Sequence, residues 1–193
     1  GLTRSEDIEA AAALGVEWIG FNVWSGSPRC VPAEQALELS RDLKSWQTPI
    51  AVCVWTNPAS LKAAQRTGFS HVQVHSTPAH WADRDTAFPT SRLIRAVSVT
   101  NALEPGHLSG ADYYLVDTPS KLLGGSGKTF DWSLLFAVKN HPALILAGGL
   151  RPGNVADAIR AVRPFAVDVA SGIEQKPGIK DTALMLAFVE EVK

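Results

Sequence analysis

The sequence predicts an α/β fold, specifically a (β/α)8 TIM barrel whose first β-strand is absent or truncated. Seven short apolar runs alternate with polar or glycine-rich loops and helical patterns along the 193 residues. Several of these runs are apolar at nearly every position, which is typical of parallel strands covered on both faces. The chain opens on a helix start with no apolar run before it, so a barrel of eight strands would lack its first. An open sheet of seven strands is the alternative.

The predicted strands follow one another at regular intervals. Their apolar runs cover residues 17–23, 50–54, 71–74, 93–99, 113–117, 143–148 and 165–170. Helical segments separate them, as expected for successive strand–helix units. The length suits one domain, which we expect to cover residues 1–193.

Helix signals occupy the segments between the strands. Thr3 and Glu6 fit a capping box, in which the threonine hydroxyl accepts from a backbone N–H and the glutamate reaches back. Gly15 is the expected left-handed stop of that helix. Further start signals are Pro32 and Pro152, which suit a first turn, and Asp181, which suits the cap of a last helix over residues 182–192.

Composition excludes several classes of function. A net charge of −1 and a pI near 6.6 give no basic surface for nucleic acid. No apolar run approaches the length of a membrane span, and no secretory signal is visible. Cys30 and Cys53 lack metal-ligand spacing, so we expect free thiols and a cytoplasmic protein.

A glycine-rich segment with a lysine, LLGGSGKTFDW at residues 122–132, raises the question of nucleotide binding. The P-loop pattern needs a glycine five positions before Gly127, where this chain has Leu122. A P-loop also runs directly into a helix, whereas Asp131 is the expected cap of a helix that starts later. The segment is therefore a poor match to a nucleotide site.

Small-residue turns follow the last two predicted strands. They are Ala147–Leu150, with Gly148 and Gly149, and Ala170–Ile173, with Ser171 and Gly172. Backbone N–H groups in such turns can approach an anion closely, and barrel enzymes often bind phosphate at these two loops. One such turn alone would be an ordinary turn that ends a strand, but two in succession predict a phosphate-binding site.

Two carboxylates lie at or near strand ends. Asp117 ends the run YYLVD and is expected to face the mouth of the barrel, although it could instead form a turn before Thr118. Asp168 lies inside an apolar strand, where an unpaired charge would be costly. Arg95 is a natural partner for it in a structural ion pair.

Three other polar residues are candidates for the site, and each could instead have a purely structural role or be solvated. Gln73 and His75 place two polar groups at the end of the third apolar run, where a histidine with satisfied hydrogen bonds is common. Arg29, in the loop after the first run, could orient an anionic substrate. It could equally be a solvated loop arginine.

These motifs recur in order along the chain. They are Gly1–Thr3, Ser27–Arg29, Gln73-x-His75, Leu115-x-Asp117, 124–132, 147–150, 163–172 and 176–181. Together they resemble the phosphoribosylanthranilate isomerase family, barrel enzymes of tryptophan biosynthesis. The segment at 124–132 is the most specific part of the resemblance, which places it as a loop covering the substrate.

The resemblance implies an Amadori rearrangement of a phosphoribosyl substrate, with no metal or other cofactor. It makes Asp117 the general acid and directs Arg29 at the anthranilate carboxylate. The phosphate-binding residues are then Gly148, Gly149, Ser171 and Gly172, and further substrate contacts come from Gln73, His75, Gly125, Gly127 and Asp168. The family's general base is a cysteine at the end of the first strand, which falls immediately before Gly1. Neither nucleic acid nor membrane is an expected partner. We expect a monomer, and fusion to another enzyme of the pathway is left open.

Three departures from the family pattern surround the expected anthranilate site. Cys53–Trp55 replaces Phe-Val-Asn, Ser76 replaces a glycine, and the stretch Asn22–Gly26 is unusual. They leave open a related phosphosugar enzyme with an altered aryl site. The general base missing from this sequence leaves open a second alternative, a non-catalytic protein that binds a phosphorylated ligand.

Overall fold

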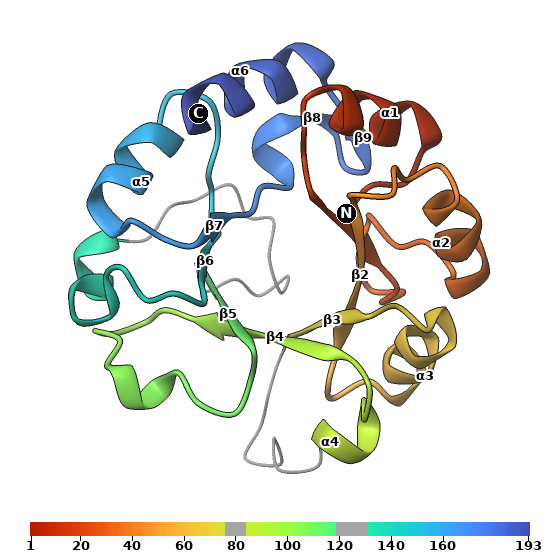
Figure 1. Ribbon diagram of the computed structural model, residues 1–193, viewed down its shortest axis with the longest axis horizontal. Coiled ribbons are helices and arrows are strands. Elements are labelled where there is room, and N and C mark those ends of the chain that lie inside the picture. The colour runs from red at the N-terminus through yellow and green to blue at the C-terminus, as the bar shows by residue number, and fades with distance from the viewer. Residues whose placement is uncertain (76–83, 119–130) are drawn as a thin grey trace.

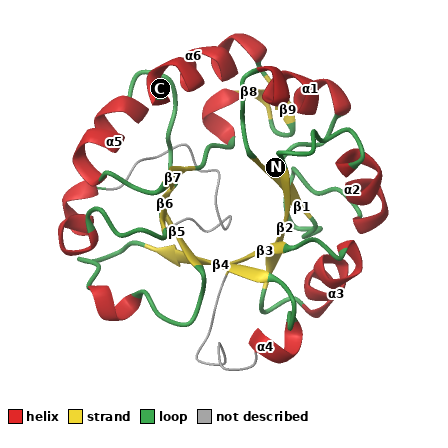
Figure 2. Ribbon diagram, viewed as in Figure 1, coloured by secondary structure: helices red, strands yellow, loops and turns green. Residues whose placement is uncertain are grey.

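The computed structural model describes residues 1–75, 84–118 and 131–193. Seven parallel strands form one sheet, and their order in space is their order along the chain, β1 to β7. The sheet curves into a ring and the helices lie outside it (Figure 1 and Figure 2). A doubly wound sheet would reverse its strand order at a switch point. The predicted parallel α/β fold of TIM-barrel type is thus confirmed.

The boundaries of the elements lie close to the predicted ones. The ring strands are β1 (Trp18–Asn22), β2 (Thr48–Val54), β3 (His71–His75), β4 (Arg92–Ser98), β5 (Tyr113–Asp117), β6 (Leu144–Leu146) and β7 (Ala166–Val167). The α-helices are α1 (Ser5–Ala13), α2 (Ala33–Ser40), α3 (Pro58–Thr67), α4 (Arg84–Ala87), α5 (Val155–Val162) and α6 (Thr182–Val192). Three 3-10 helices, η2 (Pro105–His107), η3 (Trp132–Val138) and η4 (Ser171–Ile173), and a hairpin of β8 (Glu174–Lys176) and β9 (Ile179–Lys180) complete the described elements. None of the described helices is long and apolar enough to cross a bilayer.

Two apolar cores lie on opposite faces of the strands. The inner core fills the ring with Ile50, Ile94, Leu115, Ile145 and Ala147. The outer core, between strands and helices, takes the alternate residues, such as Tyr114 and Val116 on either side of Leu115. Because side chains alternate along a strand, this pattern fixes which polar residues enter the ring.

The start of α1 differs from the predicted capping box. Arg4 is the N-cap residue and no side chain caps the helix. The Thr3 hydroxyl instead donates to the Gly178 carbonyl oxygen at 2.6 Å. The prediction was wrong because the Thr3 hydroxyl forms a hydrogen bond with a residue near the other end of the chain and does not cap the helix.

The other helix signals hold with two shifts, the first of which is that Pro32 is the N-cap residue of α2 and not part of its first turn. Gly15 has a φ of 81°, as its left-handed stop requires, and the Asp181 side chain accepts from the N–H groups of Ala183 and Leu184. Pro152 precedes α5 instead of opening it, because the helix begins at Val155.

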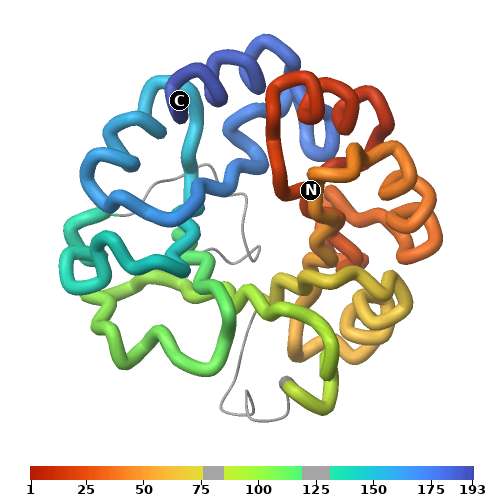
Figure 3. Tube along the Cα trace, viewed as in Figure 1, coloured from red at the N-terminus to blue at the C-terminus, as the bar shows by residue number. Residues whose placement is uncertain are grey.

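Within the described residues, no ladder joins β7 to β1. On the β1 side of this opening, the Leu2 N–H donates to the Gly20 carbonyl oxygen at 3.0 Å. The first and last helices of the chain, α1 and α6, lie side by side in the outer layer of helices at this opening (Figure 3).

An aromatic cluster bridges the ring at the amino ends of its strands. Trp18 lies with its ring centroid 5.0 Å from Tyr113, 5.4 Å from His71 and 6.1 Å from Phe165. Tyr113 and Phe165 stack at 5.5 Å. Trp18 in β1 thus contacts a residue next to β7, across the opening in the sheet.

We expect Trp18→Ala to lower the free energy of unfolding by about 2–3 kcal/mol, since it removes a large ring and three aromatic contacts. Urea unfolding monitored by circular dichroism measures the change in the free energy of unfolding. Trp46→Ala is the matched control, because Trp46 is 48% exposed. An equal effect of the two substitutions would contradict a bridging role for Trp18.

Candidate functional site

Asp117 ends β5 and touches the loop that follows β6. Its Oδ1 accepts a hydrogen bond from the Thr118 N–H at 2.7 Å. A Cβ added at Gly148, where φ is +87°, would lie 3.0 Å from that Oδ1 and 2.5 Å from Thr118 Oγ1. The carboxylate and the first small-residue loop therefore lie side by side at the carboxyl ends of the strands.

The Asp117 carboxyl keeps its proton to a higher pH than an ordinary aspartate does. Burial raises its pKa to about 6, the Thr118 N–H opposes this, and the negative charge of Asp168 adds to it. A carboxyl with such a pKa can donate a proton near neutrality, as a general acid must.

The two small-residue loops abut one another. A Cβ added at Gly172 would lie 1.9 Å from the Leu150 carbonyl oxygen. Within the part of the chain that the structure describes, the N–H groups of Gly148, Gly149, Ser171 and Gly172 donate to no other group. Neighbouring backbone N–H groups of this kind form an arrangement that can bind an anion.

Asn154 shapes the first of these loops, and sequence reasoning missed it. Its Nδ2 donates to the Gly149 carbonyl oxygen at 3.1 Å, and its Oδ1 accepts from the Arg151 N–H at 2.9 Å. An asparagine just before a helix was the available signal, since asparagine is common at that position.

Gln73 and His75 both enter the ring from β3. Gln73 is buried, and its Nε2 lies 2.8 Å from Nε2 of His75. Burial lowers the pKa of His75 to about 4, so its imidazole is neutral at physiological pH. The pair is a neutral polar group at the carboxyl end of β3.

Arg29, after β1, is a buried residue and not a solvated loop arginine. Its Nε donates to Glu174 Oε1 at 2.8 Å and its Nη2 to Glu174 Oε2 at 2.7 Å. Glu174 also accepts from Lys180 Nζ at 2.9 Å. Sequence reasoning missed both Glu174 and Lys180, because neither stands at the end of a ring strand and only tertiary contacts reveal them.

The predicted ion pair of Arg95 with Asp168 is wrong. Ile94 and Ala96 belong to the inner core, so Arg95 between them faces outward. Asp168 follows Ala166 by two residues and shares its inward direction. The two side chains lie on opposite faces of the sheet.

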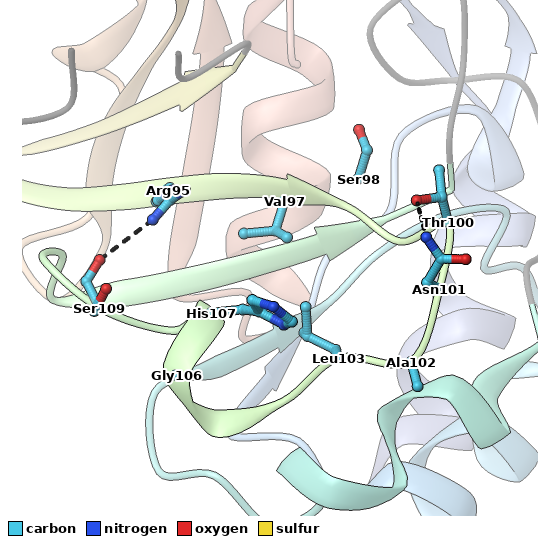
Figure 4. Close-up of a pocket in the computed structure, with 10 residues that line it drawn as sticks. All are labelled: Arg95, Val97, Ser98, Thr100, Asn101, Ala102, Leu103, Gly106, His107 and Ser109. Carbon is cyan, nitrogen blue, oxygen red and sulfur yellow. Dashed lines mark hydrogen bonds between the residues drawn. The ribbon is translucent and has the colours of Figure 1, made fainter. Parts of the chain in front are cut away.

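Arg95 instead borders a hollow on the outside of β4, where its Nη1 donates to the Ser109 carbonyl oxygen at 3.4 Å (Figure 4). The other residues around this hollow are Val97, Ser98, Thr100, Asn101, Ala102, Leu103, Gly106 and His107. Val97 and Leu103 of this hollow pack in the outer core, so these two residues face away from the ring interior.

Asp168 has its electrostatic partners inside the ring. Its charge raises the pKa of Lys180 against the larger lowering by burial, and it also raises the pKa of Asp117. It therefore lies close enough to both Lys180 and Asp117 for its charge to act on each of them.

Neither cysteine of the chain is a ready base. Burial raises the pKa of Cys53 to about 12, and Cys53 packs in the outer core, away from the ring interior. Burial also raises the pKa of Cys30. Both thiols are therefore protonated near neutral pH.

Some predicted site residues cannot be placed. Gly125, Gly127 and most of the segment 122–132 lie outside the described residues, as does Ser76. Asp131 is described, and it caps η3 as predicted by accepting from the Ser133 N–H at 2.9 Å. Trp55, at the end of β2, packs against the outer core.

Comparison with known proteins gives one consistent answer. The family model for N-(5'-phosphoribosyl)anthranilate (PRA) isomerase matches residues 1–191. The protein named N-(5'-phosphoribosyl)anthranilate isomerase in Pseudomonas putida (strain W619) is 39% identical over 199 residues, which cover 100% of this chain and 95% of the relative.

Solved structures agree with the sequence match. Phosphoribosyl anthranilate isomerase from Thermus thermophilus superposes with a TM-score of 0.87 at 27% identity, covering 99% of this chain and 94% of that one. A structure of the isomerase in complex with reduced 1-(o-carboxyphenylamino)-1-deoxyribulose 5-phosphate gives a TM-score of 0.79 at 31% identity, covering 98% of this chain and 94% of that one. From the family match, the relatives and the shared fold, it follows that this chain belongs to the N-(5'-phosphoribosyl)anthranilate isomerase family.

Proposed function

We propose that this chain catalyses the Amadori rearrangement of N-(5-phosphoribosyl)anthranilate to 1-(2-carboxyphenylamino)-1-deoxyribulose 5-phosphate, a step of tryptophan biosynthesis. One observation carries the proposal. A carboxyl with a pKa of about 6 lies directly against a loop whose backbone N–H groups have no acceptor among the described residues. A phosphorylated substrate held by that loop would present its sugar to the carboxyl.

The phosphate is bound by the loops after β6 and β7. The N–H groups of Gly148, Gly149, Ser171 and Gly172 supply the donors, and Asn154 fixes the first loop through the Gly149 carbonyl. Bonds from neutral donors to a charged phosphate are stronger than bonds between neutral groups. Phosphate binding therefore anchors the substrate at a fixed distance from Asp117.

Asp117 acts as the general acid in the first step. It gives its proton to the ring oxygen of the ribofuranose, and the C1–O bond breaks as the anilino nitrogen forms a Schiff base at C1. A base then removes the proton from C2, and the electron pair moves to give an enolamine. Tautomerisation of the enolamine yields the aminoketose, with no change in overall oxidation state.

The anthranilate end of the substrate is held on the other side of the site. Arg29 binds its carboxylate through the guanidinium edge that Glu174 leaves open. Gln73, His75 and Asp168 line the ring between the two ends and contact the sugar. Gly125 and Gly127 belong to the loop assigned to cover the substrate.

A further strand supplies the base. The opening between β7 and β1 is flanked by Gly1, whose position lies within van der Waals distance of Asn22 at the end of β1. A parallel strand in that opening, ending just before Gly1, would close the ring of a single (β/α)8 domain. Its last residue, the family's cysteine, would face the substrate opposite Asp117.

The function is tested with the full-length protein. Substrate prepared from anthranilate and phosphoribosyl pyrophosphate loses anthranilate fluorescence as it is converted. Steady turnover supports the proposal, whereas tight binding without turnover would favour a non-catalytic protein. That the enzyme works in the cytoplasm, as a monomer or fused to another enzyme, stays a prediction.

We expect the Asp117 carboxyl to titrate with a midpoint of about 6. Carbon-13 NMR of protein labelled at aspartate carboxyls measures it, and Asp117→Asn identifies the signal. Because burial and the Asp168 charge favour the protonated form, Asp168→Asn should lower the midpoint.

The same shift has a consequence for stability. A carboxyl whose pKa is raised on folding contributes stability below its unfolded pKa and loses that contribution as pH rises through about 6. Wild type should therefore lose stability relative to Asp117→Asn between about pH 4 and pH 6. A midpoint near 4 in the wild type, or a stability difference independent of pH, would contradict the raised pKa.

A further inference from the structure

Glu174 holds the Arg29 guanidinium by one of its edges. The Arg29 Nε lies 2.8 Å from Oε1 and the Nη2 lies 2.7 Å from Oε2. The side chain of Glu174 is 4% exposed and that of Arg29 is 11% exposed. Because the Arg29 guanidinium is buried and makes two hydrogen bonds to one carboxylate, its plane is held in one orientation.

Glu174 is itself held from three sides. Its Oε1 accepts from Lys180 Nζ at 2.9 Å and from the Gly178 N–H at 3.2 Å, in addition to Arg29. The Lys180 Nζ also donates to the Ala170 carbonyl oxygen at 3.0 Å. The β8–β9 hairpin therefore links the loop after β1 to the phosphate loop after β7 through one carboxylate.

Charge keeps this arrangement intact. Burial alone would raise the pKa of Glu174, but the hydrogen bonds and charges of Arg29 and Lys180 outweigh it and the pKa is lowered. Burial lowers the pKa of Lys180, whose bonds to Glu174 oppose the change. Glu174 is ionised throughout the physiological range.

The remaining donors of Arg29 define what it can bind. A guanidinium has five N–H donors in a planar fork. Glu174 occupies the Nε–H and one Nη2–H, which leaves the edge formed by Nη1 and the other Nη2–H. That edge matches the two oxygens of a carboxylate.

We propose that Glu174 is a positioning residue that sets the plane of Arg29 so that its open edge receives the aryl carboxylate of the substrate, and that Lys180 secures Glu174 in this position. The inference rests on the proposed function, because it takes the substrate to be an N-aryl aminosugar phosphate with an ortho carboxylate. It gives the hairpin a role in specificity, since an aryl group without the carboxylate gains nothing from this arrangement.

The test compares two ligands on the full-length protein. One is reduced 1-(o-carboxyphenylamino)-1-deoxyribulose 5-phosphate, and the other is the same compound without the carboxylate. Isothermal titration calorimetry gives the ratio of their Kd values. In Glu174→Gln the amide NH2 meets an arginine donor, so the guanidinium loses its fixed plane. We expect the preference for the carboxylated ligand to fall about tenfold, with the Kd of the other ligand unchanged.

The chain offers a matched control. Arg66 and Glu34 form an ion pair at the surface, with side chains 60% and 71% exposed. Glu34→Gln removes the same charge from the same kind of pair and should leave both Kd values and KM unchanged. Glu174→Gln should raise KM about tenfold with a smaller change in kcat.

Glu174→Asp provides a second variant that keeps the charge on a shorter side chain. Its preference for the carboxylate should lie between those of wild type and Glu174→Gln. An unchanged ratio of Kd values in either folded variant overturns the inference. An equal loss of affinity for both ligands also overturns it. Absence of turnover in the wild type would overturn the proposed function, so the two failures are distinct.

Discussion

Asp117→Asn should lower kcat of the full-length protein by about 10²–10⁴-fold, the range for a general acid. Asparagine keeps the shape of the side chain and an oxygen that can accept from the Thr118 N–H, now 2.7 Å from Oδ1. It has no proton to give to the sugar ring oxygen. Substrate should therefore bind to the variant and remain unopened.

Two measurements separate a catalytic loss from a structural one. Loss of anthranilate fluorescence gives kcat, and calorimetry with the reduced product analogue gives affinity, which should change by no more than a few-fold. Asp42→Asn is the control, since Asp42 is exposed in the turn after α2, at the amino ends of the strands. Turnover within tenfold of wild type in Asp117→Asn would remove Asp117 from the role of general acid.

Gly172→Ala should weaken binding of the phosphorylated ligand by about 10²-fold or more. The new Cβ would lie 1.9 Å from the Leu150 carbonyl oxygen and 2.9 Å from the Leu150 carbonyl carbon. These are backbone atoms, so the two loops must separate and their N–H groups no longer converge. The loss of two charge-assisted bonds, each worth about 1.5–3 kcal/mol, gives the expected size.

The measurement is calorimetry with the reduced product analogue and with inorganic phosphate. Gly106→Ala is the control, because no atom lies within 4 Å of a Cβ there and the position is outside the site. Thermal unfolding of Gly172→Ala reports whether the ring remains folded. A folded variant with unchanged phosphate affinity would show that these loops do not form the phosphate site.

Local patterns were enough to predict where the strands lie along the chain. Runs such as residues 113–117 became β5 with the same limits, because a strand covered on both faces must be apolar along its whole length. The turns with Gly148 and Gly172 could be recognised because small residues are needed where two backbones approach closely. Asp117 could be placed because it directly ends an apolar run.

Long-range pairing could not be predicted in the same way. Arg95 and Asp168 both looked like charges inside strands, but one residue of register decides which face each takes, and they fall on opposite faces. Thr3 fitted a local cap and instead bonds to Gly178, 175 residues away.

The sequence by itself determined the α/β class, the positions of the strands along the chain and the loops where an anion can approach the backbone. These follow from periodicity and from the steric demands of single residues, which act over a few positions. Only the tertiary structure decided that Glu174 and Lys180 surround Arg29 and that burial beside Asp168 raises the pKa of Asp117 to about 6. Partner choice and desolvation depend on what lies nearby in space, and distant parts of the chain supply it.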